Sequence, residues 1–409
     1  MADVPRIISV DDHIVEPPSL WTDRIPAKYQ DRCPRVERRY GYLDYDTGGK
    51  LDFIDDPGHQ NPQSRPTDLW LYDDLIWPML AGWAAVGPAA ELESVTPITY
   101  EDMLPGCYKQ AERLADMDLN HTEASLCFPT VPRFCGQTFL EREDKVLAAL
   151  CVQAYNDWMI DEWCGGDGAG RLIPLTLVPL WDPELAAAEI RRCAAKGSHA
   201  IAFSELPAYL GLPSIHSGAW DPMFQACQET ETVINMHVGS ASKLTTTSDD
   251  APVPVWVALT AQNAQASMVD WLVSGKLAQF PSLRLAFSEG QVGWMPFMLE
   301  RLDSIWKRGD SYDRDLRVRL PRPPSTYIEG RIWGCIFEDI HGLANRDIVG
   351  MSQIMYETDY PHADSTFPNS KKTAEELIAA AALNDHEAWQ FVRGNAIACY
   401  GLERFGITS

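Results

Sequence analysis

Acidic and histidine side chains recur in this sequence at the ends of short apolar segments. The members of this set are Asp11, His13, His237, Glu289, Glu357 and Asp359. Asp11 and His13 are two residues apart, so their side chains share one face of an extended strand. A buried carboxylate is costly without a partner, and Lys and Arg are nearly absent from these segment ends. A divalent metal ion is the economical partner, and we expect the set to converge on one.

Eight short apolar segments position these side chains. They span residues 7–13, 123–130, 171–180, 199–206, 232–239, 283–290, 331–339 and 354–361. Near-continuous apolar character is typical of parallel strands that are buried on both faces. Helical segments are expected between them at 182–197, 220–230, 292–308 and 373–383, and the first has Asp182 and Pro183 at its start and Gly197 at its end. This alternation predicts an α/β fold, a (β/α)8 TIM barrel with its active site at the C-terminal ends of the strands.

The barrel is expected to form a single domain over residues 1–409. A doubly wound sheet would need a Gly-rich turn after the first strand, and SVDDHIVEPP has none. Residues 31–120 form a large insertion between strands 1 and 2, and their charged, Gly- and Pro-rich start predicts a β-hairpin over the barrel mouth. Residues 240–262 and 309–330 are expected to be long functional loops.

Composition restricts the classes of partner. The net charge is −24, which disfavours nucleic acid and anionic membrane surfaces. The most apolar stretch, residues 75–90, is too short and too interrupted to span a bilayer, and MADVPRIISVDD shows no secretory signal. The ten cysteines lack metal-site spacing and indicate buried thiols. We therefore expect a cytoplasmic protein that acts on a small molecule.

Several segments together resemble a known family. They are SVDDHIVEPPSLW (9–21), IHSGAWDPMF (215–224), NMHVG (235–239), SEGQVGWMPFMLERLD (288–303) and ETDYPHADSTFP (357–368). The sequence resembles the amidohydrolase superfamily, specifically the amidohydrolase-related branch that includes metal-dependent decarboxylases and hydrolases of carboxylated aromatics. The resemblance covers nearly the whole chain. It implies a (β/α)8 barrel with a divalent metal at its mouth.

The resemblance also implies roles for individual residues. The metal ligands would be Asp11, His13, His237, Glu289 and Asp359. Two positions depart from the family pattern, because Asp11 stands where His or Glu is common and Glu289 replaces a usual histidine. There is also no obvious fourth-strand lysine to bridge two metals. The oxygen-rich set shifts preference toward Mn or Fe while zinc stays open, with one or two ions. Glu289 is a ligand, a bridge or a general acid/base, because strand-end geometry permits all three.

Further residues complete the prediction. Asp359, Glu289 and His362 are the expected catalytic residues, and His216 and His341 are the expected substrate-binding residues. Each of the last two histidines has an alternative role, since His216 could cap a helix and His341 could hydrogen-bond a carboxylate that binds the metal. Glu16 is a ligand or a loop anchor, and Glu357 is treated as structural.

Three functions stay open at this point. The first is hydrolysis by a metal-activated water, or decarboxylation of an aromatic acid at the same site. The second is a dinuclear Fe or Mn/Fe oxygenase, for example an amine N-hydroxylase. The third is a non-catalytic partner subunit of a related enzyme. A homo-oligomer, or a hetero-oligomer with such a subunit, is expected in each case.

Overall fold

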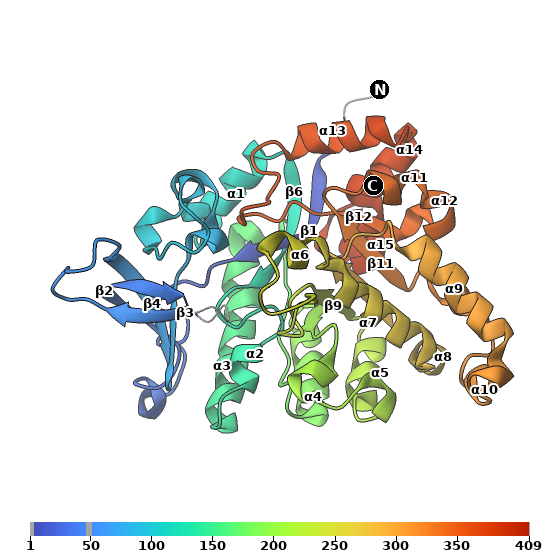
Figure 1. Cartoon of the computed structure of the whole chain (residues 1–409), viewed down its shortest axis with the longest axis horizontal. Coiled ribbons are helices and arrows are strands. Elements are labelled where there is room, and N and C mark those ends of the chain that lie inside the picture. Colours follow the sequence, from blue (N-terminus) through green and yellow to red (C-terminus); the bar gives the residue numbers. More distant parts are fainter. Residues whose placement is uncertain (1–3, 46–50, 409) are drawn as a thin grey trace.

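The computed structural model describes residues 4–45 and 51–408, and parallel strands form its centre (Figure 1). One sheet has the order β1-β6-β7 and the other the order β12-β11-β10-β9-β8. These strands are β1 (Ile7–Ile14), β6 (Thr122–Pro129), β7 (Leu172–Ile173), β8 (Ala200–Phe203), β9 (Val233–His237), β10 (Arg284–Ser288), β11 (Ile332–Ile336) and β12 (Ile354–Tyr356). Each lies within or overlaps one of the eight apolar segments, so the predicted α/β class is confirmed.

Hydrogen bonds join the two parallel sheets at both of their edges. On one side Thr176, after β7, forms a parallel bridge with Ile201 of β8. On the other side the Asp359 backbone N–H donates to the Asp11 carbonyl at 2.9 Å, and the His13 N–H donates to the Tyr360 carbonyl. The ends of β1 and β12 are thereby held side by side.

Helices surround these strands (Figure 1). They are α1 (Gln110–Leu119), α2 (Gln137–Leu140), α3 (Lys145–Trp158), α4 (Pro183–Ala195), α5 (Asp221–Glu229), α6 (Val253–Ala258), α7 (Ala261–Val273), α8 (Lys276–Gln279), α9 (Met295–Lys307), α10 (Leu316–Arg319), α11 (Ile340–Ala344), α12 (Arg346–Val349), α13 (Ser370–Ala380), α14 (Asp385–Trp389) and α15 (Asn395–Tyr400). The predicted start of α4 is confirmed, since the Asp182 carboxylate accepts the backbone N–H groups of Glu184 and Leu185. Among the described residues no helix is both long and apolar enough to cross a bilayer.

The segment between β1 and β6 folds as a small antiparallel sheet of order β3-β2-β4-β5. Its strands are β2 (Arg35–Tyr45), β3 (Leu51–Asp55), β4 (Arg65–Tyr72) and β5 (Leu75–Pro78). It is larger than the predicted hairpin because two further strands form after β3. Helix α1, at the end of the predicted range 31–120, packs against β6. The residues that join β2 to β3 lie outside the described part of the chain.

The core follows from the apolar strands. Every residue of β1, β8, β9, β11 and β12 is buried. One continuous cluster of buried apolar side chains extends from Val4 to Ile407. All ten cysteines are buried free thiols, as the sequence indicates. The polar side chains at the strand ends are therefore held in a largely dehydrated environment.

Candidate metal centre

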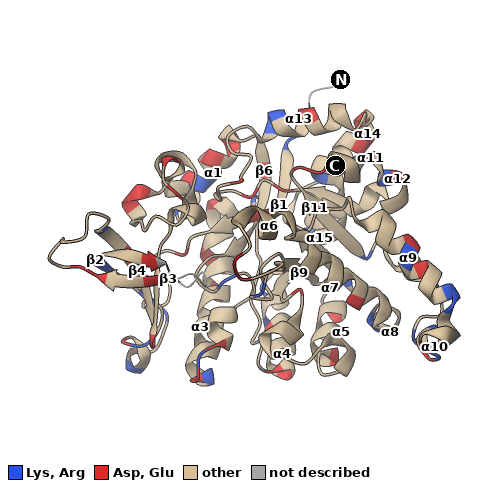
Figure 2. Cartoon of the chain, in the orientation of Figure 1, with Lys and Arg blue, Asp and Glu red and all other residues tan. Residues whose placement is uncertain are grey.

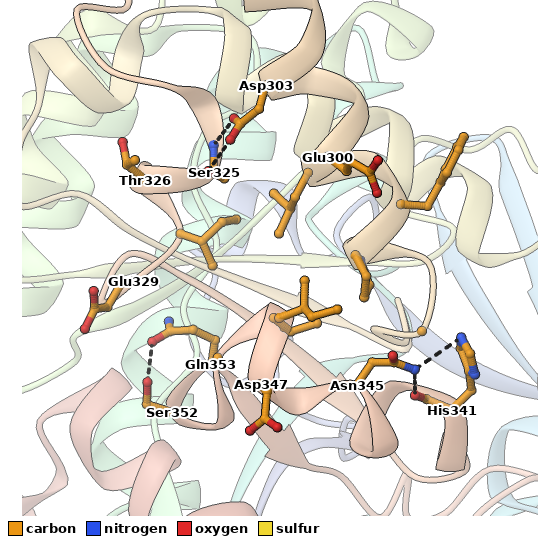
Figure 3. Close-up of a pocket in the computed structure, with 18 residues that line it drawn as sticks. Glu300, Asp303, Ser325, Thr326, Glu329, His341, Asn345, Asp347, Ser352 and Gln353 are labelled. Carbon is orange, nitrogen blue, oxygen red and sulfur yellow. Dashed lines mark hydrogen bonds between the residues drawn. The ribbon is translucent and has the colours of Figure 1, made fainter.

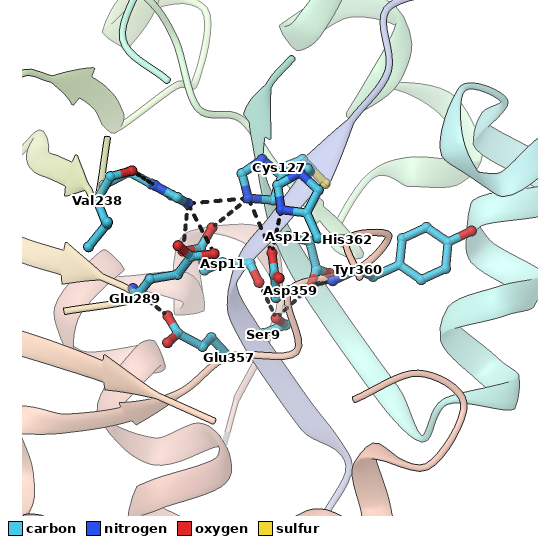
Figure 4. A network of polar contacts seen from close by, with 12 residues as sticks. Ser9, Asp11, Asp12, Cys127, Val238, Glu289, Glu357, Asp359, Tyr360 and His362 are labelled. Atoms are coloured by element: carbon cyan, nitrogen blue, oxygen red, sulfur yellow. Dashed lines mark hydrogen bonds and ion pairs between the residues drawn. The ribbon is translucent and has the colours of Figure 1, made fainter. Parts of the chain in front are cut away.

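Six side chains at the strand ends converge on one small volume (Figure 4). Two overlapping sets offer metal ligands: Asp11, His13, His237 and Glu289, and His13, Glu289, Asp359 and His362. Within each set the ligand atoms all lie within 4.8 Å of one another. Ligands of one ion lie about 2.0–2.6 Å from it, so two of them can be no more than roughly 5 Å apart. Each set therefore fits around a single cation.

Consecutive side chains of strand β1 point in different directions, either into the ligand cluster or away from it. Asp11 and His13 point into the cluster, with the His13 Nε2 3.6 Å from an Asp11 oxygen. Asp12 points elsewhere, and its carboxylate accepts hydrogen bonds from the hydroxyl groups of Ser125 and Thr358. Because Ser125 belongs to β6 and Thr358 follows β12, Asp12 ties three strands together. The two adjacent aspartates thus have different surroundings, and only Asp12 is fully hydrogen-bonded.

The two strand histidines face each other through their Nε2 atoms, which are 3.2 Å apart. The other nitrogen of His237, Nδ1, lies 2.6 Å from the Val238 carbonyl oxygen and must carry the hydrogen of that contact. Burial lowers the pKa of His237 to about 4. Burial, together with nearby His362, also holds the pKa of His13 well below its ordinary value. Both rings are therefore neutral, and the Nε2 lone pair of His237 points into the cluster, as metal binding requires.

The carboxylates in the cluster lack ordinary partners. Both oxygens of Asp11 are buried and have no hydrogen-bond donor among the described residues, whereas an Asp359 oxygen lies 3.3 Å from the His13 Nε2 and 3.0 Å from the His362 Nδ1. Burial raises the pKa of Asp11 well above its usual value, and the neighbouring Glu357 and Glu289 raise it further. Buried anions without a counter-charge are strongly disfavoured. The donor set therefore fits a divalent cation, and its mixture of two imidazoles with carboxylates suits Mn, Fe or Zn.

His362 adds a second imidazole beside Asp359. Its Nδ1 lies 3.0 Å from an Asp359 oxygen, and its ring stacks on His13 with centroids 3.7 Å apart. Burial would lower the pKa of His362, but the Asp359 carboxylate outweighs it and raises that pKa. Burial likewise opposes ionisation of Asp359, yet His362 and His13 hold its pKa below the usual range. The pair is thus a charged histidine next to a carboxylate.

Backbone conformation helps to aim two of the carboxylates. Glu289 and Asp359 have φ values of 55° and 54°, in the left-handed region that residues other than glycine rarely adopt. Glu357 supports the first of them, since its carboxylate accepts the Glu289 backbone N–H at 3.1 Å. Strained residues of this kind cluster at functional sites. Neither position is a glycine, and aspartate and glutamate differ here, since only aspartate is enriched in this conformation.

A buried carboxylate outside the cluster also escaped the sequence analysis. Glu205 follows β8 and is only 3 % exposed. One of its oxygens accepts the Gly239 N–H at 3.2 Å and the Asn263 amide at 3.1 Å, while the other has no partner among the described residues. Its own N–H donates to the Ser240 hydroxyl. Burial raises the pKa of Glu205 to about 7. Glu205 therefore fastens the loop that begins just after His237.

A cavity of about 240 Å³ opens beside the cluster. Its lining residues are His13, Trp77, Trp83, Pro129, Thr130, Arg133, Phe134 and His362. The Trp77 and Trp83 rings meet edge to face at 4.9 Å, and both come from the segment between β1 and β6. Phe134 lies flat on His237, with ring centroids 4.2 Å apart. None of these aromatic residues belongs to a recognisable motif: Trp77 lies in β5, Trp83 in a short 3-10 helix, and Phe134 in the segment between β6 and α2.

Three other predicted residues lie away from the ligand atoms. His216 is exposed, with its Nε2 3.2 Å from Asp270, and His341 is exposed on α11 beside Asn345. Neither belongs to the ligand sets or lines the aromatic cavity, so their predicted substrate-binding role is not carried further. Glu16 is a loop anchor, because its carboxylate accepts the backbone N–H groups of Thr130 and Val131. The sequence placed these groups near the mouth but could not give their orientation.

The fold and the site together define a class of protein: an α/β protein with a cluster of candidate metal ligands at the ends of its parallel strands. The amidohydrolase family model matches residues 60–402. The chain therefore belongs to the amidohydrolase family. The match includes His237, Glu289 and Asp359, whereas Asp11 and His13 precede it.

Solved structures share this fold at low sequence identity. An amidohydrolase from Mycobacterium avium subsp. paratuberculosis K-10 is 17% identical, with a TM-score of 0.68 over 97% of this chain and 99% of that one. The 2,6-dihydroxybenzoate decarboxylase from Rhizobium is 15% identical, with a TM-score of 0.58 over 98% and 99%. The 5-carboxyvanillate decarboxylase from Novosphingobium aromaticivorans DSM 12444, complexed with manganese and 4-hydroxy-3-methoxy-5-nitrobenzoic acid, is 18% identical, with a TM-score of 0.58 over 79% and 88%. At these identities the likeness concerns the fold alone.

Proposed function

We propose that this protein is a metal-dependent decarboxylase of a single-ring aromatic carboxylic acid. The observation that carries the proposal is the position of buried carboxylates, of which Asp11 has no hydrogen-bond donor among the described residues, and of two neutral histidines, beside an aromatic cavity. Asp11, His13 and His237 would hold one ion, Asp359 would hold the same ion or a second one, and Glu289, which belongs to both sets of candidate ligands, would be a further ligand or a bridge. Manganese is the first metal to test, because it accompanies the aromatic acid in the Novosphingobium decarboxylase structure.

The proposal includes a closed (β/α)8 barrel that forms one domain over residues 1–409. The Thr176–Ile201 bridge and the hydrogen bond between Asp359 and Asp11 support closure at the two edges where the parallel sheets meet. Closure would direct the C-terminal ends of all eight strands to one mouth, where barrel enzymes have their active sites. The contribution of Trp77 and Trp83 to the cavity supports a role for the segment 31–120 at that mouth.

The cavity supports an aromatic acid as the substrate class. Its volume of about 240 Å³ is below the roughly 300–1,000 Å³ of pockets for drug-sized ligands, so it suits a single ring. Trp77, Trp83 and Phe134 offer apolar faces and edges for that ring. Arg133 is the single Lys or Arg among its lining residues, and its guanidinium, which pairs with Glu141, has further N–H groups that would donate to an anion.

The reaction would break the bond between the ring carbon and the carboxylate. A bound metal would orient the carboxylate and stabilise charge that develops on the ring substituents. The electron pair of the broken bond stays on the ring carbon, which takes a proton as carbon dioxide leaves. His362 is placed to donate that proton, because it lines the cavity and Asp359 keeps it charged. Water would then return a proton to His362.

Metal content and carbon dioxide release test this proposal. The purified protein should contain a divalent metal. It should release carbon dioxide from at least one acid in a panel of monohydroxybenzoic, dihydroxybenzoic and carboxylated methoxyphenol acids. Chelation of the metal should abolish this turnover, and added manganese should restore it. Glu376→Gln, an exposed change on α13, is the matched control and should retain full turnover. Absence of carbon dioxide release from every acid by the metal-loaded protein would contradict the proposal.

Hydrolysis is the second candidate, because the same ligand set could make a water acidic enough to attack a carbonyl. The family name and the Mycobacterium amidohydrolase support it. Release of an amine or alcohol from amides or esters, without carbon dioxide, would favour it over decarboxylation. The oxygenase and the non-catalytic subunit, which the sequence left open, gain no support from the similar structures described above, and we do not propose them.

A further inference from the structure

The aromatic cavity beside the candidate metal centre differs in charge from a larger pocket on the outer surface. The outer pocket lies between α9 and the helices α11 and α12 and has a volume of about 870 Å³ (Figure 3). Glu300, Asp303, Glu329 and Asp347 line it, and no Lys or Arg does so within the described part of the chain. Acidic residues also lie on most other elements (Figure 2), and the net charge is −24. The outer pocket therefore repels an aromatic anion, whereas the small cavity, which Arg133 lines, suits one.

Two tryptophans form one wall of the small cavity. Trp77 lies in β5, and Trp83 lies in the short 3-10 helix Ala81–Ala84 that follows β5. Their rings meet edge to face with centroids 4.9 Å apart, and both residues are partly exposed. The antiparallel sheet that contains β5 lies to one side of the parallel strands (Figure 1). The wall is therefore built by a part of the chain outside the strands that carry the candidate ligands.

A row of tryptophans supports this wall from behind. Trp70 of β4 is paired directly with Trp77 of β5, so the two side chains share one face of the antiparallel sheet. Trp21 meets Trp70 edge to face with centroids 5.3 Å apart, and both are buried. The Trp21 indole N–H donates to the Cys151 carbonyl of α3 at 3.0 Å. The row connects the wall to the buried core, so the wall cannot retreat without disturbing core packing.

The backbone that precedes Trp83 is fixed as well. The Ala81 N–H donates to the Thr96 carbonyl at 2.9 Å, and the Gly82 N–H donates to the Ser94 carbonyl at 2.8 Å. A Cβ on Gly82 would lie 3.0 Å from Ser94, so the two segments are in close contact. A ligand that presses on Trp83 therefore meets a fixed surface rather than a mobile loop.

The volume of the cavity corresponds to one substituted ring. A cavity of about 150 Å³ holds one benzene molecule, and on that scale a hydroxybenzoic acid needs about 250 Å³. A hydroxynaphthoic acid, which has a second fused ring, needs about 350 Å³ on the same scale. The cavity has about 240 Å³. It therefore accommodates the first acid, and the second would have to displace the wall.

We propose that Trp77 and Trp83 determine the size of the substrate, because they end the cavity behind the first ring and exclude acids with a second fused ring. The inference rests on the proposed aromatic acid substrate. His13 and His362 line the cavity where it meets the ligand cluster. A carboxylate bound there leaves its ring between these histidines and the tryptophans. The antiparallel sheet is thus the specificity element for a site whose ligands come from other strands.

A matched pair of acids tests the wall. The acids 2-hydroxybenzoic and 3-hydroxy-2-naphthoic acid share a carboxylate with a neighbouring hydroxyl and differ by one fused ring. In a site without a wall the larger apolar area favours the larger acid. Isothermal titration of the manganese-loaded full chain should instead show that the smaller acid binds at least about tenfold more tightly, because the larger one overpacks the cavity.

Truncation of the wall should remove this preference. Trp83→Ala takes away an indole, itself a two-ring group, so the ratio of the two Kd values should fall by at least about tenfold. Trp77→Ala should shift the ratio in the same direction and provides the test if Trp83→Ala does not fold, as circular dichroism would show. Trp181→Ala is the matched control, since Trp181 is also partly exposed but does not line the cavity. It should leave the ratio unchanged.

The outcomes separate this inference from the proposed reaction. A ratio that neither Trp83→Ala nor Trp77→Ala changes would overturn the wall, and so would a wild type that binds the larger acid as tightly as the smaller one. Carbon dioxide release is measured on the same samples. A shifted ratio without carbon dioxide release would support the wall and contradict decarboxylation, whereas carbon dioxide release with an unchanged ratio would do the reverse. A wild type that binds neither acid would overturn both.

Discussion

The Nε2 atoms of His13 and His237 lie 3.2 Å apart, although 224 positions separate the two residues in the sequence. A hydrogen bond from Nδ1 to the Val238 carbonyl fixes the ring of His237, so its Nε2 carries a lone pair. Two neutral imidazoles face one another beside the Asp11 carboxylate, which has no hydrogen-bond donor among the described residues.

Asp11 and Asp12 should respond oppositely to the same substitution. Asp11→Asn removes a buried charge that has no donor, so the metal-free protein should be at least as stable as wild type while its metal affinity falls. The loss of affinity should exceed the roughly 10–100-fold cost of losing an outer-shell partner. Asp12→Asn weakens the bonds from Ser125 and Thr358 and should cost about 2–3 kcal/mol of unfolding free energy. Urea unfolding of the metal-free protein and titration with metal measure both effects. Equal destabilisation of the metal-free protein by Asp11→Asn and Asp12→Asn would contradict the assignment of Asp11 to the metal site and of Asp12 to the structure.

Asp359→Asn should abolish turnover without unfolding the protein. Asp359 contributes a ligand atom and also keeps His362 charged, so one substitution removes a metal contact and weakens the proton donor. We expect turnover to fall by at least about 100-fold, with lower metal occupancy and an unchanged circular dichroism spectrum. Turnover like that of the wild type in this variant would show that the catalytic assignment is wrong.

Glu205→Gln should stabilise the protein in a pH-dependent way. Burial raises the pKa of Glu205 from about 4.5 when unfolded to about 7 when folded. The unfolded chain therefore ionises first as pH rises, and the native state loses stability between pH 4.5 and 7. Above pH 7 the penalty is constant and on the order of 3 kcal/mol. The free energy of unfolding in urea of Glu205→Gln should exceed that of the wild type most at pH 8.5 and little at pH 5. The exposed change Glu376→Gln should show no such difference, and an equal gain of Glu205→Gln at both pH values would contradict the prediction.

Gly239→Ala should disturb the aromatic wall of the cavity. Gly239 has a φ of +88°, and a Cβ there would lie 2.8 Å from the Phe134 ring. The added methyl would cost about 1–2 kcal/mol in backbone strain and push Phe134 off His237. KM for the aromatic acid should rise. In the double variant Phe134→Ala/Gly239→Ala, the change in binding free energy inferred from KM should be smaller than the sum of the changes in the two single variants, because removal of the Phe134 ring removes the clash. Full additivity would mean that the two residues act independently.

The sequence was sufficient for the strands and for much of the cluster. The apolar segments that end in Asp11, His13, His237, Glu289 and Asp359 form parallel strands, and these residues fall in two overlapping sets of candidate ligands, while their role as metal ligands stays a prediction. The prediction worked because parallel strands place their C-terminal ends on one side, whatever their separation along the chain. The sequence pattern could not show that His216 and His341 lie away from the candidate ligands, since residues after a strand can turn toward the site or away from it.

Sequence by itself determined the class of fold and the kinds of ligand atom available, because strand periodicity and side-chain chemistry are local properties. Only the tertiary structure decided that Asp12 is hydrogen-bonded while its neighbour Asp11 is not, that Glu205 is buried, and that Trp77, Trp83 and Phe134 line one cavity. These features depend on contacts between segments far apart in the chain. The direction in which each of these side chains points is set by packing between segments, and no single segment encodes that packing.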